Sequence, residues 1–184
     1  MRILVLSDVH ANLTALEAVL AAAGTVDAVW CLGDIVGYGP DPNQCIEVIH
    51  SLPTLLCILG NHDAAALGQI ALEAFNQEAQ QSIRWLRSEL THAHRGFLES
   101  LPDKLVTGEV TLAHGSPRNP VWEYLLDTFT AAENFDSFET LYCFVGHTHL
   151  PLAYVYRDDG QVMRQPLDGD AAVYLTARPI LNPG

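Results

Sequence analysis

The first 63 residues alternate short apolar runs with amphipathic stretches, and this alternation constrains the fold more than any other feature of the 184-residue chain. We expect the apolar runs to form buried strands and the amphipathic stretches to form helices between them. The expected strands are residues 2–8, 27–34 and 54–63, and the expected helices are residues 14–24 and 41–52. This order predicts parallel strands joined by crossover helices.

Local signals at the helix ends support both helices. Thr14 and Glu17 have the spacing of a capping box, and Gly24 follows as a stop signal. Asp41 is placed to cap the second helix, and Pro42 suits the first position of that helix.

The rest of the chain is richer in hairpins. We expect two helices within residues 73–100, two strands around a turn at Gly108, a strand at residues 141–149, and a hairpin over residues 151–166 that turns at residues 158–160. The length fits one domain. The elements therefore predict a single α/β domain over residues 1–184, two-layered or sandwich-like, with helices outside.

The composition argues against several classes of protein. The formal net charge of −13 would repel long nucleic acid polymers, although bound cations would reverse the charge locally for a small anionic substrate. No apolar run approaches the roughly 20 residues that span a bilayer. The N-terminal run is typical of a buried strand rather than a signal peptide, so we expect no membrane partner and a cytoplasmic location. The four cysteines form no C-x-x-C pair and are expected to be buried thiols.

Polar residues of the kind that bind metals follow each predicted strand. They are Asp8 and His10, Asp34, Asn61 with His62 and Asp63, His114, and the pair His147 and His149. Ligands bind α/β sheets beyond the carboxyl ends of the strands, so five separate segments would aim these side chains at one edge.

Carboxylate, amide and imidazole donors without thiolates indicate a catalytic rather than a structural metal site. The donors are too many for one open ion, and two ions that share a carboxylate fit better. Such a pair holds the attacking and the leaving oxygen in phosphoryl transfer. Glycines at positions 33, 60 and 146 would let the chain approach the ions closely.

Taken together, these motifs resemble those of the calcineurin-like metallophosphoesterases. The matching motifs are D-x-H (Asp8, His10), G-D (Gly33, Asp34), G-N-H-D (Gly60 to Asp63), His114 before a glycine, and G-H-T-H (Gly146 to His149). The compact length, with GDIVGYGPDP and LAHGSPRNPVWEY, is similar to the small bacterial branch of that family. The resemblance implies a two-sheet β-sandwich core with flanking helices. It also implies binuclear, metal-dependent hydrolysis of phosphate mono- or diesters by a hydroxide between the metals.

The resemblance assigns a role to each matched residue. One metal would be held by Asp8, His10, Asp34 and His149, and the other by Asp34, Asn61, His114 and His147, with Asp34 as the bridge. The two divalent ions would be Mn, Zn, Fe or Ni. His62 would protonate the leaving oxygen, and Asp63 would orient its imidazole. Otherwise, His62 would be a helix-start histidine that bonds a neighbour. Asn61 would also contact the substrate.

Further expectations concern the loops near this edge. Because His147 and His149 would serve different metals, the backbone should bend between them, with Gly146 permitting the bend and Thr148 pointing into the packing. Arg118, four residues after His114, would clamp a phosphate oxygen, or else pair with a surface carboxylate. Trp122 and Tyr124 would stack on an aromatic leaving group, or else pack their loop onto the core.

Two features depart from the family pattern. The segment GDIVGYGP lacks the arginine of the GD-x-x-D-R-G pattern found in protein phosphatases, which weakens a phosphoprotein substrate without excluding it. The sequence ends on ARPILNPG, where relatives usually continue, so we expect a truncated C-terminus whose unpaired strand edge favours a homodimer.

The sequence therefore predicts a phosphoesterase acting on a small phosphorylated substrate, either a small nucleotide such as a dinucleoside polyphosphate or a phosphoprotein. The alternative is a non-catalytic, metal-binding interaction platform on the same fold. A platform of that kind would not need the complete ligand set and His62.

Overall fold

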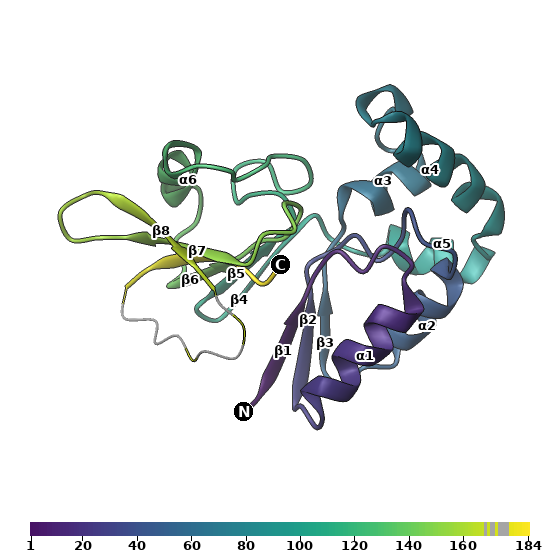
Figure 1. Ribbon diagram of the computed structural model, residues 1–184, viewed down its shortest axis with the longest axis horizontal. Coiled ribbons are helices and arrows are strands. Elements are labelled where there is room, and N and C mark those ends of the chain that lie inside the picture. The colour runs from purple at the N-terminus through teal and green to yellow at the C-terminus, as the bar shows by residue number, and fades with distance from the viewer. Residues whose placement is uncertain (168, 170–171, 173–176) are drawn as a thin grey trace.

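A three-stranded parallel sheet forms the N-terminal half of the fold. The computed structural model describes residues 1–167, 169, 172 and 177–184. Strands β1 (Ile3–Leu6), β2 (Ala28–Cys31) and β3 (Leu55–Cys57) lie in that order and are joined by α1 (Leu13–Ala23) and α2 (Pro42–His50). The predicted parallel order with crossover helices is confirmed (Figure 1).

A six-stranded mixed sheet forms the C-terminal half, in the order β4-β5-β6-β9-β7-β8. Its strands are β4 (Lys104–Thr107), β5 (Val110–Ala113), β6 (Tyr142–Phe144), β7 (Leu152–Tyr156), β8 (Val162–Pro166) and β9 (Pro179–Asn182). The β4–β5 and β7–β8 hairpins occur where the sequence predicts them. Strand β9 lies inside the sheet, parallel to β6 and antiparallel to β7.

The remaining helices flank the two sheets. They are α3 (Asn61–Leu67), α4 (Gln77–Glu89), α5 (His92–Glu99) and α6 (Thr128–Asn134), with short 3-10 turns at Leu72–Ala74 and Phe135–Ser137. The two helices expected within residues 73–100 are therefore confirmed.

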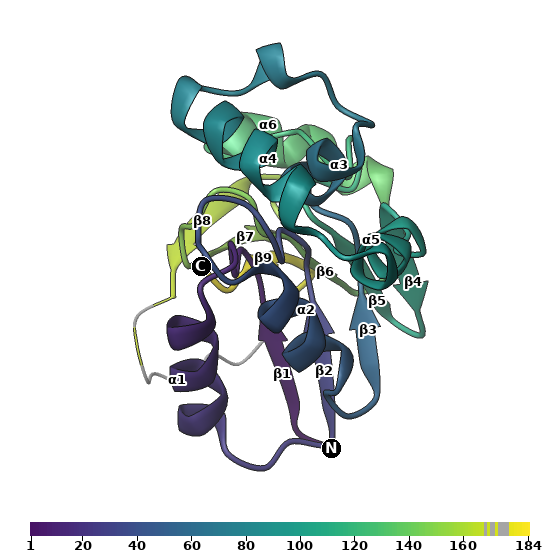
Figure 2. The same cartoon turned by 90° about the vertical axis from the view of Figure 1, so that its right-hand side faces the viewer.

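The two sheets pack face to face because successive side chains of a strand point to opposite sides. Val5, Trp30 and Leu56 of the first sheet contact Leu112 and Phe144 of the second in one apolar cluster. The residues that alternate with them, such as Leu6, Val29 and Cys31, pack instead with residues of the helices α1, α2, α4 and α5. Helix α6 lies on the far face of the second sheet, so the molecule has a two-sheet core with outer helices, as predicted (Figures 1 and 2).

Several local boundaries differ from those expected. Asn12, not Thr14, caps α1, because its side chain accepts the Ala15 N–H at 3.0 Å. Asp41 occupies the N-cap of α2 and Pro42 begins that helix, but the Asp41 side chain makes no capping hydrogen bond. Strand β3 ends at Cys57, and the G-N-H-D motif begins α3 instead.

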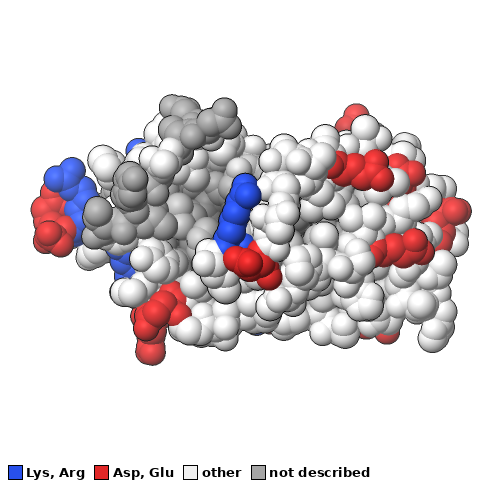
Figure 3. All heavy atoms as spheres, turned by 90° about the horizontal axis from the view of Figure 1, so that it is seen from below, with Lys and Arg blue, Asp and Glu red and all other residues white. Residues whose placement is uncertain are grey.

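Three features of the structure bear on the expectations drawn from composition: the cysteines, the apolar helices and the basic side chains. All four cysteines are buried and unbridged. Among the described residues, no helix has both the length and the apolar character needed to cross a membrane. On the face drawn in Figure 3, the described basic side chains do not gather into a continuous patch.

Candidate metal centre

The carboxyl ends of five strands meet at one edge of the sandwich, and backbone hydrogen bonds tie their loops together. After β1 and β2, the Asp8 and His10 amides donate to the carbonyls of Gly33 and Asp34 at 3.1 and 2.9 Å. After β5 and β6, the Gly146 amide donates to the His114 carbonyl at 2.8 Å. The two sheets are joined where the His147 amide donates to Asp8 Oδ2 at 3.0 Å.

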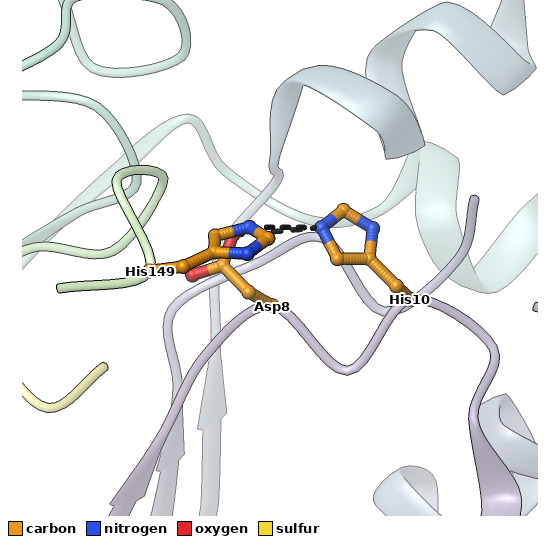
Figure 4. Close-up of side chains that lie close together, drawn as sticks. All are labelled: Asp8, His10 and His149. Carbon is orange, nitrogen blue, oxygen red and sulfur yellow. Dashed lines mark hydrogen bonds and ion pairs between the residues drawn. The ribbon is translucent and has the colours of Figure 1, made fainter. Parts of the chain in front are cut away.

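One group of candidate ligands consists of Asp8, His10 and His149, and we call it the outer group. The Nε2 atoms of His10 and His149 are 3.2 Å apart, and His149 Nε2 is 3.3 Å from Asp8 Oδ1 (Figure 4). His10 Nδ1 donates to the Val36 carbonyl at 3.3 Å, which leaves Nε2 facing the other two residues. The His149 side chain is 53% exposed, so this group borders solvent.

A second group consists of Asp34, His114 and His147, and we call it the inner group because all three residues are buried. His114 Nδ1 donates to the Leu32 carbonyl at 2.8 Å, which leaves Nε2 as the atom that would bind an ion. That Nε2 is 3.0 Å from Asn61 Oδ1 and 3.4 Å from Asp34 Oδ2. His147 Nε2 donates to the Trp122 carbonyl at 3.2 Å, which leaves Nδ1 as the free acceptor.

Asp34 lies between the two groups. Its Oδ2 is 3.4 Å from His114 Nε2 and 3.8 Å from His10 Nε2, while its Oδ1 accepts the His62 amide at 2.8 Å. One carboxylate therefore faces both sets of imidazoles and also fixes the start of α3.

The backbone at this edge is strained. Asp8, His10, Asp34, His147 and His149 all have φ between 49° and 67°, a left-handed region that residues with a side chain seldom adopt. Five of the seven expected metal ligands therefore have strained backbones, and strain of this kind persists where the surrounding structure enforces it, often at functional sites.

The bend between His147 and His149 is present, but Gly146 does not supply it. The positive φ angles are those of the two histidines, at 67° and 55°. Gly146 is needed for space instead, since a Cβ at this position would collide with the Ser7 hydroxyl and approach Asp8 Oδ2 to 2.8 Å. Thr148 contacts strand β9, where its Oγ1 accepts from Asn182 Nδ2 at 2.9 Å.

The buried charges of the site depend on one another, and Asp34 and His114 form its central pair. Burial alone would raise the pKa of Asp34, but the neighbouring histidines, His114 foremost, outweigh burial and hold that pKa well below its usual range. Burial would lower the pKa of His114, but the charge of Asp34 raises it to about 9. Burial lowers the pKa of His62 and of His147 to about 4 each, so both rings are neutral at pH 7.

The distances between donor atoms also fit divalent cations. Two ligands bonded to one ion at about 2.0–2.2 Å stand about 3.0–3.5 Å apart in tetrahedral or octahedral geometry. The closest pairs lie 3.2 and 3.3 Å apart in the outer group, and 3.0 and 3.4 Å apart between His114 and its neighbours Asn61 and Asp34. Buried Asp8 Oδ1 accepts no well-aligned hydrogen bond from a described residue, although His149 Nε2 lies 3.3 Å away, and a bound cation would satisfy this oxygen.

Comparison with known proteins identifies the family. The sequence profile of the calcineurin-like phosphoesterase superfamily domain matches residues 1–166. The chain belongs to the calcineurin-like phosphoesterase superfamily. The expected family is thus confirmed, and so is the expected class of enzyme, a hydrolase acting on phosphoester bonds.

Three individual proteins illustrate the similarity. The chain is 46% identical to a metallophosphoesterase from Sphaerobacter thermophilus of known crystal structure, with a TM-score of 0.89 over 100% of this chain and 76% of that one. It is 35% identical to an uncharacterized protein of Methanocaldococcus jannaschii over 99% of this chain and 74% of that protein. It is also 32% identical, over 127 residues, to a symmetrical bis(5'-nucleosyl)-tetraphosphatase of Pectobacterium atrosepticum. That match covers 54% of this chain and 45% of the tetraphosphatase.

The family role expected for Asp63 is not the one that this carboxylate plays. Its Oδ2 accepts the Gly60 amide at 3.0 Å and its Oδ1 accepts the Val36 amide at 3.1 Å, so the prediction that Asp63 orients His62 is wrong. The physical reason is position: at the third residue of α3, a carboxylate turns back to the N-cap amide, as in a capping box. Asp63 thereby ties the loop after β2 to the start of α3.

Aromatic rings hold His62 instead. Its ring lies 4.7 Å from that of Tyr38, 4.9 Å from that of His10 and 5.1 Å from that of Phe75. Its Nδ1 is buried without a hydrogen-bond partner among the described residues, which leaves Nε2 to exchange a proton.

Arg118 is engaged by carboxylates of its own loop and of α6. Its guanidinium bonds Glu123 and, at 3.0 Å, Glu133 Oε2. These contacts correspond to the second possibility given for Arg118, which was pairing with carboxylates. The phosphate clamp at Arg118 stays a prediction.

Of the two aromatic residues in the same loop, Tyr124 lines the hollow of the site and Trp122 packs behind it against Phe75. The Tyr124 ring lies 3.7 Å from that of His147, and the Trp122 ring packs edge-on against Phe75 at 5.0 Å. Trp122 also supplies the carbonyl that fixes His147.

Two residues of the site have no counterpart among the expected ones. Asn182 on β9 donates to the Gly146 carbonyl at 2.6 Å and thus supports the G-H-T-H loop, but a single Asn in an apolar strand gives little signal. Tyr38 borders the ligand cluster. Its signal in the sequence is an aromatic residue between two glycines, four positions after Asp34 of the G-D motif.

Proposed function

We propose that the protein hydrolyses phosphoesters of small nucleotides with two divalent metal ions. The outer group, with Asp34, would hold one ion, and the inner group, with Asn61, would hold the other. The observation that carries the proposal is the position of Asp34, whose Oδ2 lies 3.8 Å from an outer imidazole and 3.4 Å from an inner one. A single carboxylate so placed suits a bridge between two ions better than a ligand of one.

The ions would supply the nucleophile and the charge neutralisation. When bound, divalent cations of this kind lower the pKa of water, so that hydroxide is available at neutral pH, and they polarise the phosphoryl oxygens.

The chain itself would contribute the proton and the geometry. His62 is 5% exposed beside His10 and Asp34. Burial lowers its pKa, and the negative charge of a bound phosphate would raise that pKa again, so that Nε2 would carry the proton for the leaving oxygen. Asn61 is assigned to the inner ion and to a substrate oxygen. Asp63 accepts hydrogen bonds from Val36 and Gly60 and so ties together the two loops that carry Asp34 and Asn61.

A small nucleotide is the substrate that the observations favour. The similarity to a symmetrical bis(5'-nucleosyl)-tetraphosphatase supports it, although the chain spans 45% of that protein. The net charge of −13 argues against long nucleic acids. A phosphoprotein is less favoured, because the arginine of the protein phosphatase pattern has no counterpart in GDIVGYGP. The single domain, the homodimer and the cytoplasmic location stay predictions.

A substrate panel tests this function. The purified chain would be assayed with p-nitrophenyl phosphate, bis-p-nitrophenyl phosphate and diadenosine tetraphosphate, with Mn²⁺, Zn²⁺, Fe²⁺ and Ni²⁺ in turn, and then with a chelator. We expect hydrolysis that requires metal, and two metal ions per chain by elemental analysis. Bound metal without hydrolysis of any substrate would favour an interaction platform, and full activity at one ion per chain would contradict the binuclear site.

A further inference from the structure

Tyr38 combines a strained backbone with a half-exposed aromatic ring at the edge of the metal centre. The φ angle of Tyr38 is 56°, and the residue as a whole is 46% exposed. Its ring lies 5.0 Å from that of the candidate ligand His10 and 4.7 Å from that of His62. A bulky residue at positive φ is an outlier, and it persists only where its surroundings enforce it.

The chain on both sides of Tyr38 is fixed by contacts that leave no room to relax. The Gly39 amide donates to the His10 carbonyl at 2.9 Å, and the Asp41 amide donates to the Ala11 carbonyl at 3.0 Å. A Cβ at Gly39 would collide with the His10 carbonyl, and one at Gly37 would lie 2.5 Å from His62 Nδ1. The loop, rather than packing of the ring in the core, therefore determines where the Tyr38 ring stands.

Tyr38 borders two adjoining hollows. The smaller, of about 230 Å³, lies at the candidate metal centre, where Asp34, Asn61 and His147 line it. The larger, a groove of about 660 Å³, runs from the outer group along α1, and Tyr38, His10 and His149 line both hollows. This volume suits a ligand the size of a nucleoside.

The chemistry of the groove selects a neutral occupant. Its apolar wall includes Val9, Leu16 and Val19, and its charged residues are Asp8 and Asp41. Neither Lys nor Arg is among the described residues that line it. A polyphosphate tail would therefore be repelled there, whereas a nucleobase would find an apolar wall and an aromatic face.

We propose that this groove seats the nucleoside of the substrate, with the base stacked on Tyr38, while the phosphate lies at the metal centre. In GDIVGYGP, Tyr38 stands where the GD-x-x-D-R-G pattern places its arginine. The chain thus presents an aromatic ring at the position where that pattern presents a cation. The proposal rests on the proposed function and adds the group that the enzyme recognises.

Binding of adenosine, which has no phosphate, tests the groove independently of catalysis. Calorimetric titration of the purified protein in the presence of Mn²⁺ would compare wild type with Tyr38→Ala and Tyr38→Asn. Asparagine tolerates positive φ, so the second variant removes the ring without adding backbone strain. Tyr156→Ala is the matched control, since Tyr156 is 43% exposed on β7, away from the site. We expect both Tyr38 variants to bind adenosine about 5- to 150-fold more weakly, the range for loss of one base-stacking contact, and the control to bind as wild type does.

Hydrolysis of a matched substrate pair supplies the second readout. 5'-AMP and ribose 5-phosphate share the leaving alcohol and differ by the base, so the ratio of their kcat/KM values reports base recognition. We expect Tyr38→Asn to lower this ratio by the same factor as the affinity for adenosine. Wild-type protein that does not bind adenosine, or Tyr38 variants that bind it equally well, would overturn the proposal. So would an equal loss on both substrates. If the groove proposal fails in one of these ways but the wild type still shows metal-dependent hydrolysis, the proposed function stands. If the wild type hydrolyses no substrate, the proposed function is refuted, and adenosine binding still tests the groove.

Discussion

The outer and inner groups of candidate ligands use similar side chains in different surroundings. In the outer group the His149 side chain is 53% exposed, whereas in the inner group His114 is fully buried. Both inner histidines donate to backbone carbonyls, at Leu32 and Trp122, while His149 contacts only Asp8 and His10 among the hydrogen bonds and ion pairs of the described residues.

This difference predicts unequal metal sites. A ring that is held by a carbonyl and shielded from water is preorganised for its ion, so the inner group should bind more tightly and exchange its ion more slowly. The outer group has to order an exposed side chain when it binds, and this lowers its affinity. Substitutions at the shared carboxylate and in each group would show whether the two sites differ in this way.

Asp34→Asn should have the largest effect, because this carboxylate faces both groups. We expect kcat/KM to fall by about 10⁴-fold or more, since several kcal/mol of charge stabilisation would be lost at both ions. Elemental analysis should show that both ions are depleted. Asp136→Asn, on the turn after α6, is the control for charge removal. Loss of one ion alone would show that Asp34 belongs to one group and does not connect them.

His62→Ala should come next, and it separates a proton donor from a ligand. We expect turnover of alkyl phosphoesters to fall by about 10²–10⁴-fold, and turnover of nitrophenyl esters to fall much less, because nitrophenolate leaves without a proton. Metal content should stay unchanged. If His62→Ala instead loses an ion, His62 belongs to the third candidate ligand group, formed with His10 and Asp34.

His147→Ala and His149→Ala each remove one histidine, from the inner and the outer group respectively, so each variant is the control for the other. Together they test whether the two sites differ in metal affinity. Loss of either ligand should weaken metal binding by at least about 10- to 100-fold, the usual cost of disturbing a ligand's support. We expect added Mn²⁺ to rescue the His147 variant at lower concentration, because the tighter inner site keeps the higher affinity after an equal loss. Isothermal titration and activity against metal concentration would measure this. Equal rescue of both variants would contradict unequal sites.

Glu123→Gln should have the smallest effect, and it tests the loop that supports the inner group. Burial would raise the pKa of Glu123, but hydrogen bonds from Arg118, Ser116 and Asn134 outweigh burial and lower it to about 2. A depressed folded-state pKa means that this carboxylate stabilises the fold above about pH 4.5, and that the contribution is lost as pH falls toward about 2.

Thermal unfolding would measure that contribution. The melting temperature of the wild type should exceed that of Glu123→Gln near neutral pH, and the gap should narrow as pH falls through the window from about 4.5 to about 2. Glu99→Gln, which alters an exposed pair with Arg95, is the control. A gap that is constant with pH would show that the Glu123 network does not depend on charge.

The predictions that succeed from sequence are those that rest on periodicity. Apolar alternation in β1, β2 and β3 gives both the strands and the two faces that they bury, because a strand has only two sides. The hairpins succeed for the same reason, since turn residues such as Gly108 and Gly160 interrupt two regular runs.

The predictions that fail concern where a side chain of a loop points and which distant residue it meets. Asp63 follows His62 directly, but its carboxylate turns to the amides of Gly60 and Val36, and Val36 comes from another loop. The Gly146 error is similar, since the need for a small residue comes from Ser7, 139 positions away in the chain.

Strand ends and their polar motifs are local in the chain, so the sequence alone was enough to predict the family and to place the candidate ligands at one edge of the fold. The different burial of the two ligand groups and the position of Asp34 between them emerge only from the packed fold. The same is true of the groove beside Tyr38, which has no basic side chain among the described residues that line it. The physical reason is that burial, strain and electrostatic environment arise from segments far apart in the chain that packing brings together.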